Sequence, residues 1–269
     1  MSVESVCLRC EYFKPHESNE RDPNNCEMYF GLDALCPIVI TNSQRTAIMT
    51  PRSAINLHPG DCMDAMRGMG DDAYELAIVD PPYGIGNFSR DSYTSKGGDG
   101  PRVKNDPKWD LDYKWNETCP SDEYFAEMRR VSVRQIVWGA NYYPYRCGGA
   151  VVWYKGDQAK TVSHAEIASL SFQNRVDYVH INWQPGFYRK NICDQIHPCQ
   201  KPVALYKWLL SNYAKPGDTI LDTHLGSGSI AVACWDAGYD LDAWELDPDY
   251  YAGAVARLEK HKAQGQFDL

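Results

Sequence analysis

The sequence predicts an α/β protein built on a doubly wound, mostly parallel sheet. Two observations lead to this prediction. Short apolar runs alternate with segments of helical periodicity through the last third of the chain, and the same alternation begins near residue 53. Parallel strands need crossover connections, which are usually helices. Strands that alternate with helices therefore favour a parallel sheet with helices on both faces.

The first elements outline a βαβ unit. The run SAINLHP at 53–59 is short and β-prone, and CMDAMRGM at 62–69 has helical spacing. The run ELAIVD at 75–80 has a continuous apolar centre and ends at Asp80, as in a buried strand. A helix is expected over 121–131, because Ser121 is a suitable N-cap.

The later elements continue the alternation. Three strands are expected at 134–143, 150–155 and 176–183, where β-branched and aromatic residues are frequent. A helix over 203–213 follows a proline, and a helix over 230–238 ends at a glycine. The remaining expected elements are strands at 217–222 and 240–247 and a closing helix at 250–264.

The composition limits the kind of partner. The 269 residues carry a formal net charge of -9, which argues against coating nucleic acid by bulk electrostatics. Any DNA contact must be local, and Lys and Arg outnumber Asp and Glu between Lys155 and Lys207. There is no apolar run of about 18 residues and no signal-peptide pattern at the start. We expect a cytoplasmic protein with no membrane association.

A glycine-containing turn, LDTHLGSGS at 221–229, joins a predicted strand to a predicted helix. Gly226 and Gly228 would let the backbone approach a ligand closely. Glu245 follows Asp222 at roughly the spacing of about 20 residues expected for an acid that binds ribose hydroxyls. Such a turn can also be purely structural, and the acid favours a binding site.

The second pattern is Asp80, Pro81, Pro82 and Tyr83 at the end of a predicted strand, where open α/β sheets bind ligands. The two prolines lack amide donors, so carbonyl oxygens and the Asp80 carboxylate remain as acceptors. Such a site suits an amino group. The alternative is an ordinary turn.

Three motifs together resemble those of the beta-class DNA amino-methyltransferases, which modify N6 of adenine or N4 of cytosine. They are DPPY at 80–83, HPCQKP at 197–202 and the turn at 221–229, in the circularly permuted order of that class. The resemblance covers roughly residues 55 to 258. It implies a Rossmann-like, class I fold that uses S-adenosylmethionine.

The resemblance also implies roles for individual residues. The expected catalytic residues are Asp80, Pro81, Pro82 and Tyr83. The expected cofactor-binding residues are Asp61, Asp80, Gln200, Lys201, Asp222, Gly226, Gly228 and Glu245. Within this second set, Gln200 and Lys201 would close the methionine end, Glu245 would hold the ribose, and Asp61 would meet the adenine. Without its motif, Lys201 would be taken for a solvated surface lysine.

The implied reaction is methylation of the exocyclic N6 of adenine in double-stranded DNA. Asp80 and the Pro81 carbonyl would accept hydrogen bonds from the amino group, and Tyr83 would stack on a flipped base. Asn141 and Trp153 are candidates to line the pocket, although Trp153 also fits a core position. The alternatives are methylation of N4 of cytosine, or a catalytically silent module that binds DNA or cofactor.

Two details qualify the resemblance. The common cofactor turn of the family reads DPFxGSGT, whereas this chain has Thr223, His224 and Ser229 at the variable positions. Cys199 lies in a Pro-Cys-Gln tripeptide like that of cytosine-carbon methyltransferases, but the HPCQKP context explains it better. A phage or restriction-modification setting and a homodimer are expected from the family.

The expected domain organisation has four parts. Residues 1–50 form a cysteine-containing module, 51–262 form the methyltransferase domain, 155–196 form a short target-recognition insert, and 263–269 form a tail. The module carries one C-x-x-C pair and two single cysteines, whereas tetrahedral zinc prefers two such pairs. A structural zinc ion is therefore an open possibility at Cys7, Cys10, Cys26 and Cys36.

Overall fold

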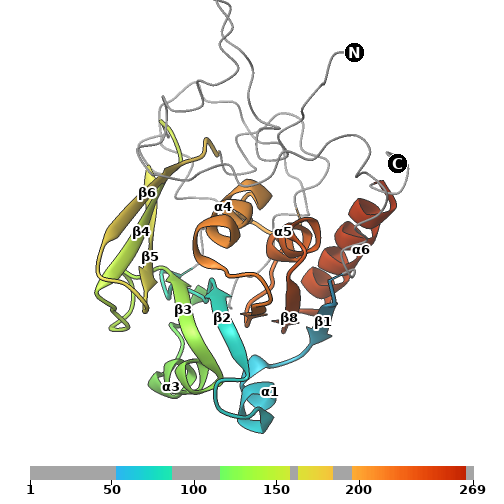
Figure 1. Ribbon diagram of the computed structural model, residues 1–269, viewed down its shortest axis with the longest axis horizontal. Coiled ribbons are helices and arrows are strands. Elements are labelled where there is room, and N and C mark those ends of the chain that lie inside the picture. The colour runs from blue at the N-terminus through green and yellow to red at the C-terminus, as the bar shows by residue number, and fades with distance from the viewer. Residues whose placement is uncertain (1–52, 87–115, 158–162, 184–195, 265–269) are drawn as a thin grey trace, which may run out of the picture. The chain divides into compact units, whose positions relative to one another are not determined.

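The computed structural model describes residues 53–86, 116–157, 163–183 and 196–264 (Figure 1). The predicted cysteine-containing module at 1–50, with Cys7, Cys10, Cys26 and Cys36, lies outside the described residues. So do the last five residues of the predicted tail. The zinc prediction therefore stays a prediction.

The described chain forms one eight-stranded sheet with the order β1-β8-β7-β2-β3-β5-β4-β6. Only β5 runs against its neighbours β3 and β4, and the other strand pairs are parallel. The predicted mostly parallel sheet is confirmed. The strands are β1 (Ile55–Pro59), β2 (Tyr74–Val79), β3 (Ser132–Trp138), β4 (Gly149–Tyr154), β5 (Ala165–Leu170), β6 (Val176–His180), β7 (Thr219–Asp222) and β8 (Asp240–Glu245).

Helices cover both faces of the sheet (Figure 1). The helices α1 (Cys62–Gly68) and α3 (Asp122–Val131) pack on one face through a core that includes Met66, Met128 and Val137. The helices α4 (Val203–Tyr213), α5 (Ser229–Ala237) and α6 (Pro248–Gln264) pack on the other face in a second core. This arrangement is the predicted doubly wound architecture.

The helix ends follow from local signals in the sequence. Ser121 is the N-cap of α3, and its hydroxyl accepts a hydrogen bond from the Tyr124 amide at 3.2 Å, as predicted. Gly238 ends α5 in the left-handed conformation, at φ 78°, which glycine adopts without steric cost. Asp61 caps α1 by accepting from the Met63 amide at 2.8 Å.

Two sequence-based expectations were wrong in part. The strand expected at 134–143 ends at Trp138, because Gly139 has φ 80° and begins a turn. In this turn the Tyr142 amide donates to the Gly139 carbonyl. The strand β5 was not predicted, since Glu166 and Ser169 interrupt its apolar pattern. The expected target-recognition insert at 155–196 thus contributes two strands, β5 and β6, to the main sheet.

The strand order reverses between β7 and β2. The chain leaves β7 through α5 to β8 on one side, and it leaves β2 through α3 to β3 on the other. Ala77 pairs with Leu221, so Asp80 and Asp222 leave the sheet at the same edge. Such a switch point opens a crevice at the carboxyl ends of the strands, where ligands bind in open α/β sheets. Among the described helices, none is both long and apolar enough to cross a membrane.

Candidate active site

The carboxylate of Asp80 lies at the centre of the site, directly after β2. Its side chain is 18% exposed and forms an ion pair with Lys201. The hydroxyl of Tyr83 donates to Asp80 Oδ1 at 2.7 Å, and Lys201 Nζ lies 3.2 Å from the same hydroxyl. The structure therefore brings the predicted DPPY turn and the lysine of HPCQKP into direct contact.

Glu166, on β5, completes this cluster and was not predicted. Its carboxylate lies 2.9 Å from Lys155 Nζ and 3.2 Å from Lys201 Nζ. The Tyr83 hydroxyl also lies 3.3 Å from Glu166 Oε2. The available signal was a single acid inside the short apolar run AEIASL, in a segment that we expected to contact DNA. A charge on a half-buried strand usually has a partner, but the sequence does not say which.

The two carboxylates carry different pKa shifts. Burial opposes ionisation of Glu166, but Lys201 and Lys155 outweigh it and lower the pKa of Glu166 to about 2. Burial raises the pKa of Asp80, Lys201 opposes this, and the charge of Glu166 adds to it. Burial also opposes the charge on Lys201, yet the two carboxylates raise the pKa of this lysine to about 12. Glu166 is therefore ionised and Lys201 is protonated at neutral pH.

Aromatic rings surround Tyr83. The ring of Tyr142 stacks on it with centroids 4.7 Å apart, and Tyr143 meets it edge-on. The Tyr143 hydroxyl donates to the Pro81 carbonyl at 2.7 Å. Pro82, half-buried, connects these contacts along the chain. The turn is thus held by contacts from the residues that follow β3.

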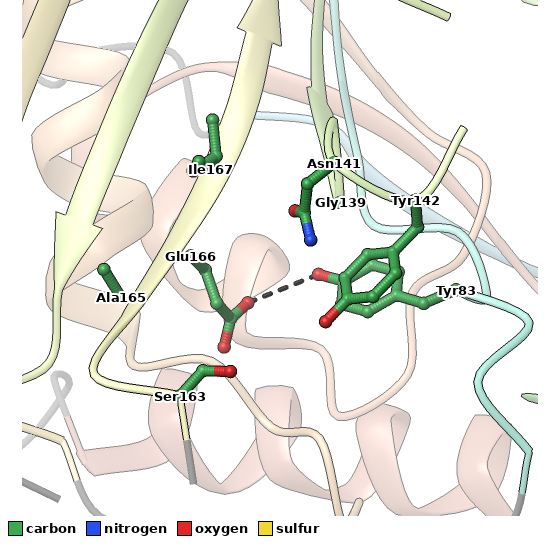
Figure 2. A pocket seen from close by; sticks show the side chains of 8 residues that line it. All are labelled: Tyr83, Gly139, Asn141, Tyr142, Ser163, Ala165, Glu166 and Ile167. Carbon is green, nitrogen blue, oxygen red and sulfur yellow. Dashed lines mark hydrogen bonds between the residues drawn. The ribbon is translucent and has the colours of Figure 1, made fainter. Parts of the chain in front are cut away.

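A cavity of about 150 Å³ opens beside Tyr83, as Figure 2 shows. Its lining residues are Tyr83, Gly139, Asn141, Tyr142, Ser163, Ala165, Glu166 and Ile167. Asn141 is therefore placed at the cavity, as anticipated. Trp153 is not among the lining residues; it is 1% exposed in the core, and its indole donates to the Ile181 carbonyl.

The cofactor-type turn follows β7. Gly226 and Gly228 have φ 52° and 71°, and an added Cβ at Gly228 would come within 3.0 Å of Ala254. Glu245, at the end of the neighbouring β8, accepts from the Gly226 amide at 2.7 Å. Burial, and then the charges of Asp80 and Glu245, raise the pKa of Asp222 to about 8.

The unusual residues of this turn form their own network. Thr223 Oγ1 lies 2.6 Å from the Tyr124 hydroxyl on α3 and 2.9 Å from His224 Nδ1. The His224 ring meets the Tyr124 ring edge-on at 5.4 Å. Burial lowers the pKa of His224 to about 4, so its imidazole is neutral at pH 7. Thr223 and His224, which stand where the common motif has Pro and Phe, are thus linked by a hydrogen bond to each other, and Thr223 also bonds Tyr124 of α3.

The HPCQKP segment connects the two halves of the site. The Ser229 hydroxyl donates to the Lys201 carbonyl at 2.7 Å, and Arg257 on α6 donates to Ser229 Oγ at 2.9 Å. The His197 ring faces Gly226, with its atoms 3.7 to 3.8 Å from the position of an added Cβ. Gln200 is buried, and its Oε1 accepts from the Ile196 amide, so it also stabilises this segment.

Asp61 lies at the carboxyl end of β1, two strands away from β7. The ends of β1, β8 and β7 are neighbours, so Asp61, Glu245 and Asp222 follow one edge of the sheet. The predicted residues thus form two groups, the Asp80 cluster and this row of acids. Among the described residues, no group of His, Cys, Asp and Glu is arranged to hold a metal ion.

Comparisons with known proteins found similarity to DNA methylases. A sequence model for a family described as DNA methylase matches residues 150–256. YubD of Escherichia coli (strain K12), whose name describes it as a methylase, is 23% identical over 216 residues, which cover 74% of this chain and 88% of that protein.

Two solved structures were also similar. The PvuII DNA methyltransferase, described as cytosine-N4-specific, has a TM-score of 0.51 and 11% identity, covering 78% of this chain and 91% of that one. The M1.HpyAVI-SAM complex has a TM-score of 0.44 and 18% identity, covering 76% and 100%. The likeness to the PvuII enzyme concerns the fold alone.

Proposed function

Because the chain belongs to the family of N6/N4 DNA methyltransferases, we propose that it methylates the exocyclic N6 of adenine in double-stranded DNA, using S-adenosylmethionine. The observation that carries this proposal is the position of the DPPY turn. Asp80 and the Pro81 carbonyl lie at the switch point of the sheet, beside the glycine turn after β7. Acceptors for an amino group and the glycine turn therefore lie at the same edge of the sheet, where open α/β sheets bind ligands.

The residues of the glycine turn fit the proposed cofactor. Gly226 and Gly228 give the turn its positive φ angles, and a side chain at Gly228 would press on Ala254, so the glycines keep the turn compact beside the strand ends. Asp222, Glu245 and Asp61 supply carboxylates along the adjoining strand ends, which suit the ribose hydroxyls and amino groups of the cofactor. When bound, S-adenosylmethionine supplies an electrophilic methyl group.

The chain's own residues would orient the acceptor nitrogen. The lone pair of an exocyclic amino group is delocalised into the base ring. Hydrogen bonds from its two hydrogens to Asp80 and the Pro81 carbonyl would localise that lone pair on the nitrogen. Each of these oxygens already accepts a protein donor but retains a further lone pair. The base must leave the duplex to reach this turn, and Tyr83 and Tyr142 offer aromatic faces to it.

Methylation of N4 of cytosine is the second candidate. It uses the same acceptor geometry, and the PvuII enzyme, whose fold is similar, is described as cytosine-N4-specific. Adenine is preferred because family members that act on cytosine more often carry Ser where this chain has Asp80. A homodimer and a restriction-modification setting remain expectations from the family, as do the roles of Gln200 and Asp61.

The test is direct. Purified protein is incubated with unmethylated genomic DNA and isotope-labelled S-adenosylmethionine, and the DNA is digested to nucleosides for mass spectrometry. Label in N6-methyladenine supports the proposal, whereas label in N4-methylcytosine supports the second candidate. Absence of label with intact cofactor binding would mean another acceptor or a silent binding module.

Replacing Asp80 should separate chemistry from cofactor binding. Asp80→Ala is expected to lower the methylation rate by at least about 100-fold, because the amino group loses its charged acceptor. Binding of S-adenosylmethionine, measured by calorimetry, should be largely retained, because the other expected cofactor-binding residues are unchanged. Asp64→Ala, on the exposed surface of α1, is the control and should keep full activity. Full activity in Asp80→Ala would contradict the role of Asp80.

A further inference from the structure

The acceptor oxygens of Asp80 are already in use before any substrate binds. The Tyr83 hydroxyl donates to Oδ1, and the Lys201 ammonium group is paired with Oδ2. Under the proposed function, an incoming amino group must share or take over one of these oxygens. Where the amino group takes over an oxygen, the donor that it displaces needs another acceptor in a buried site.

Glu166 lies within reach of both donors. Its Oε2 is 3.3 Å from the Tyr83 hydroxyl and 3.2 Å from Lys201 Nζ, while Oε1 accepts from Lys155 at 2.9 Å. The cluster therefore holds two carboxylates and two ammonium groups, with no net charge. Moving a hydrogen bond from Asp80 to Glu166 leaves this balance unchanged.

We propose that Glu166 is a positioning residue that receives the Tyr83 hydroxyl and the Lys201 ammonium group when the target amino group binds Asp80. This inference rests on the proposed function, and it concerns a residue outside the DPPY, HPCQKP and glycine-turn motifs. Glu166 acts through Tyr83 and Lys201 and forms no bond with the reacting atoms.

The energetic reason is the free-energy cost of a buried hydrogen-bond donor that has lost its acceptor. A buried hydroxyl without an acceptor costs about 1–3 kcal/mol, and a buried charge without a partner costs more. Lys201 is 4% exposed, so water cannot readily replace its partner. Lys201 and Lys155 together keep Glu166 ionised and available as an acceptor.

The position of Glu166 fits this role. Figure 2 shows its carboxylate at the wall of the 150 Å³ cavity, directed toward the Tyr83 hydroxyl, with Tyr142 stacked over the Tyr83 ring. The antiparallel pairing of β5 with β3 and β4 brings Glu166 opposite Trp153 and close to Lys155. The exchange of partners would therefore take place at the edge of the cavity next to Asp80.

Glu166→Gln is the variant that tests the inference. It keeps the shape of the side chain but lacks the negative charge and presents one acceptor oxygen instead of two. Lys155→Met removes the partner that holds Glu166, and Glu123→Gln, on the exposed surface of α3, is the matched control. Each full-length variant is assayed for kcat and KM with unmethylated DNA, for S-adenosylmethionine affinity, for thermal stability and for the pH profile of kcat/KM.

The inference predicts a specific pattern. In Glu166→Gln, kcat should fall about tenfold or more, the equivalent of about one hydrogen bond, while cofactor affinity stays within about twofold. The acid limb of kcat/KM should move to lower pH, because loss of the Glu166 charge lowers the pKa of Asp80. Lys155→Met should show a smaller change in kcat, and Glu123→Gln should match the wild type.

Other groups also face Asp80 and stay in place in these variants. They are Lys201, Tyr83, Tyr143, Cys199, Tyr206 and Asp222. A shift of the acid limb that appears only when Glu166 is changed is therefore assigned to Glu166. Because Lys201 is unchanged, the ion pair with Asp80 can persist in Glu166→Gln.

The possible failures are distinguishable. An unchanged kcat in Glu166→Gln would overturn the inference, as would a lower kcat with an unshifted acid limb, since that pattern indicates a merely structural role. Both results leave the proposed function intact, because the wild type still methylates DNA. Failure of the wild type to methylate any base would instead contradict the proposed function.

Discussion

The buried carboxylates of the site differ in what compensates their charge. Glu166 has two ammonium groups beside it, and its pKa is lowered to about 2. Asp222 is 2% exposed and accepts a hydrogen bond from the His224 amide, but its carboxylate neighbours add to the effect of burial. Its pKa is raised to about 8, so ionising Asp222 costs folding free energy when no ligand is bound.

Asp222→Asn should therefore change how stability depends on pH. A carboxyl group whose pKa is raised by folding stabilises the native state at low pH, and this contribution is lost as pH rises from about 3.8 to about 8. The wild type should lose unfolding free energy relative to Asp222→Asn across this range. The expected difference is at least about 1.4 kcal/mol, which corresponds to one pKa unit.

Urea unfolding of both proteins without cofactor, at pH 5 and pH 8.5, measures this difference. Asp64→Asn is the control, because Asp64 is 82% exposed on α1. Its unfolding free energy should run parallel to that of the wild type. Parallel curves for Asp222→Asn as well would show that Asp222 ionises at its ordinary pKa in the folded protein.

At the level of secondary-structure elements, the end of β3 supports the catalytic turn after β2. Gly139 has φ 80°, and a Cβ there would lie 2.5 Å from Tyr83 Cε1 and 2.7 Å from the Tyr143 hydroxyl. The rings of both tyrosines therefore occupy the space next to this glycine. Any side chain at 139 must displace Tyr83 or the backbone.

Gly139→Ala should lower the methylation rate by about tenfold or more, because a displacement of this size disturbs the alignment of reacting groups. Gly238→Ala is a matched control, since Gly238 has φ 78° but nothing lies within 4 Å of its added Cβ. Both variants should lose about 1 kcal/mol of stability through backbone strain. Equal rates in the two variants would mean that Tyr83 tolerates movement.

The elements also show where prediction from sequence succeeds. Helices α1, α3, α4 and α5 begin and end within one or two residues of the predicted positions, because their periodicity and caps are local. β5 was missed because Glu166 and Ser169 interrupt its apolar pattern. The same strand carries Glu166, so the missed element and the missed site residue have one cause.

Across the whole domain, the proposed cofactor site is formed by residues at the ends of three adjacent strands, β7, β8 and β1. These strands come from opposite ends of the described chain. A ligand that binds only the folded state stabilises it by mass action. At 100 times its Kd, S-adenosylmethionine should add about 2.7 kcal/mol. For a domain of this size, Tm should rise by about 5–10 °C.

Differential scanning calorimetry with and without cofactor measures this rise. Glu245→Gln should give a smaller rise at the same cofactor concentration, because a neutral amide replaces the acid expected to bind the ribose hydroxyls. Glu259→Gln, exposed on α6, is the control and should keep the full rise. If the cofactor raised the Tm of Glu245→Gln as much as that of the wild type, Glu245 would not be part of the cofactor site.

The sequence by itself determined the α/β class, the mostly parallel sheet and the three motifs, because periodicity and short residue patterns are local properties. Tertiary structure decided which side chains meet. It placed Lys201 on Asp80, Tyr142 on Tyr83, and Glu166 between two lysines. Apart from the Glu166–Lys155 pair, these contacts join segments that are distant along the chain. They depend on strand order and on one antiparallel strand, which no local pattern encodes.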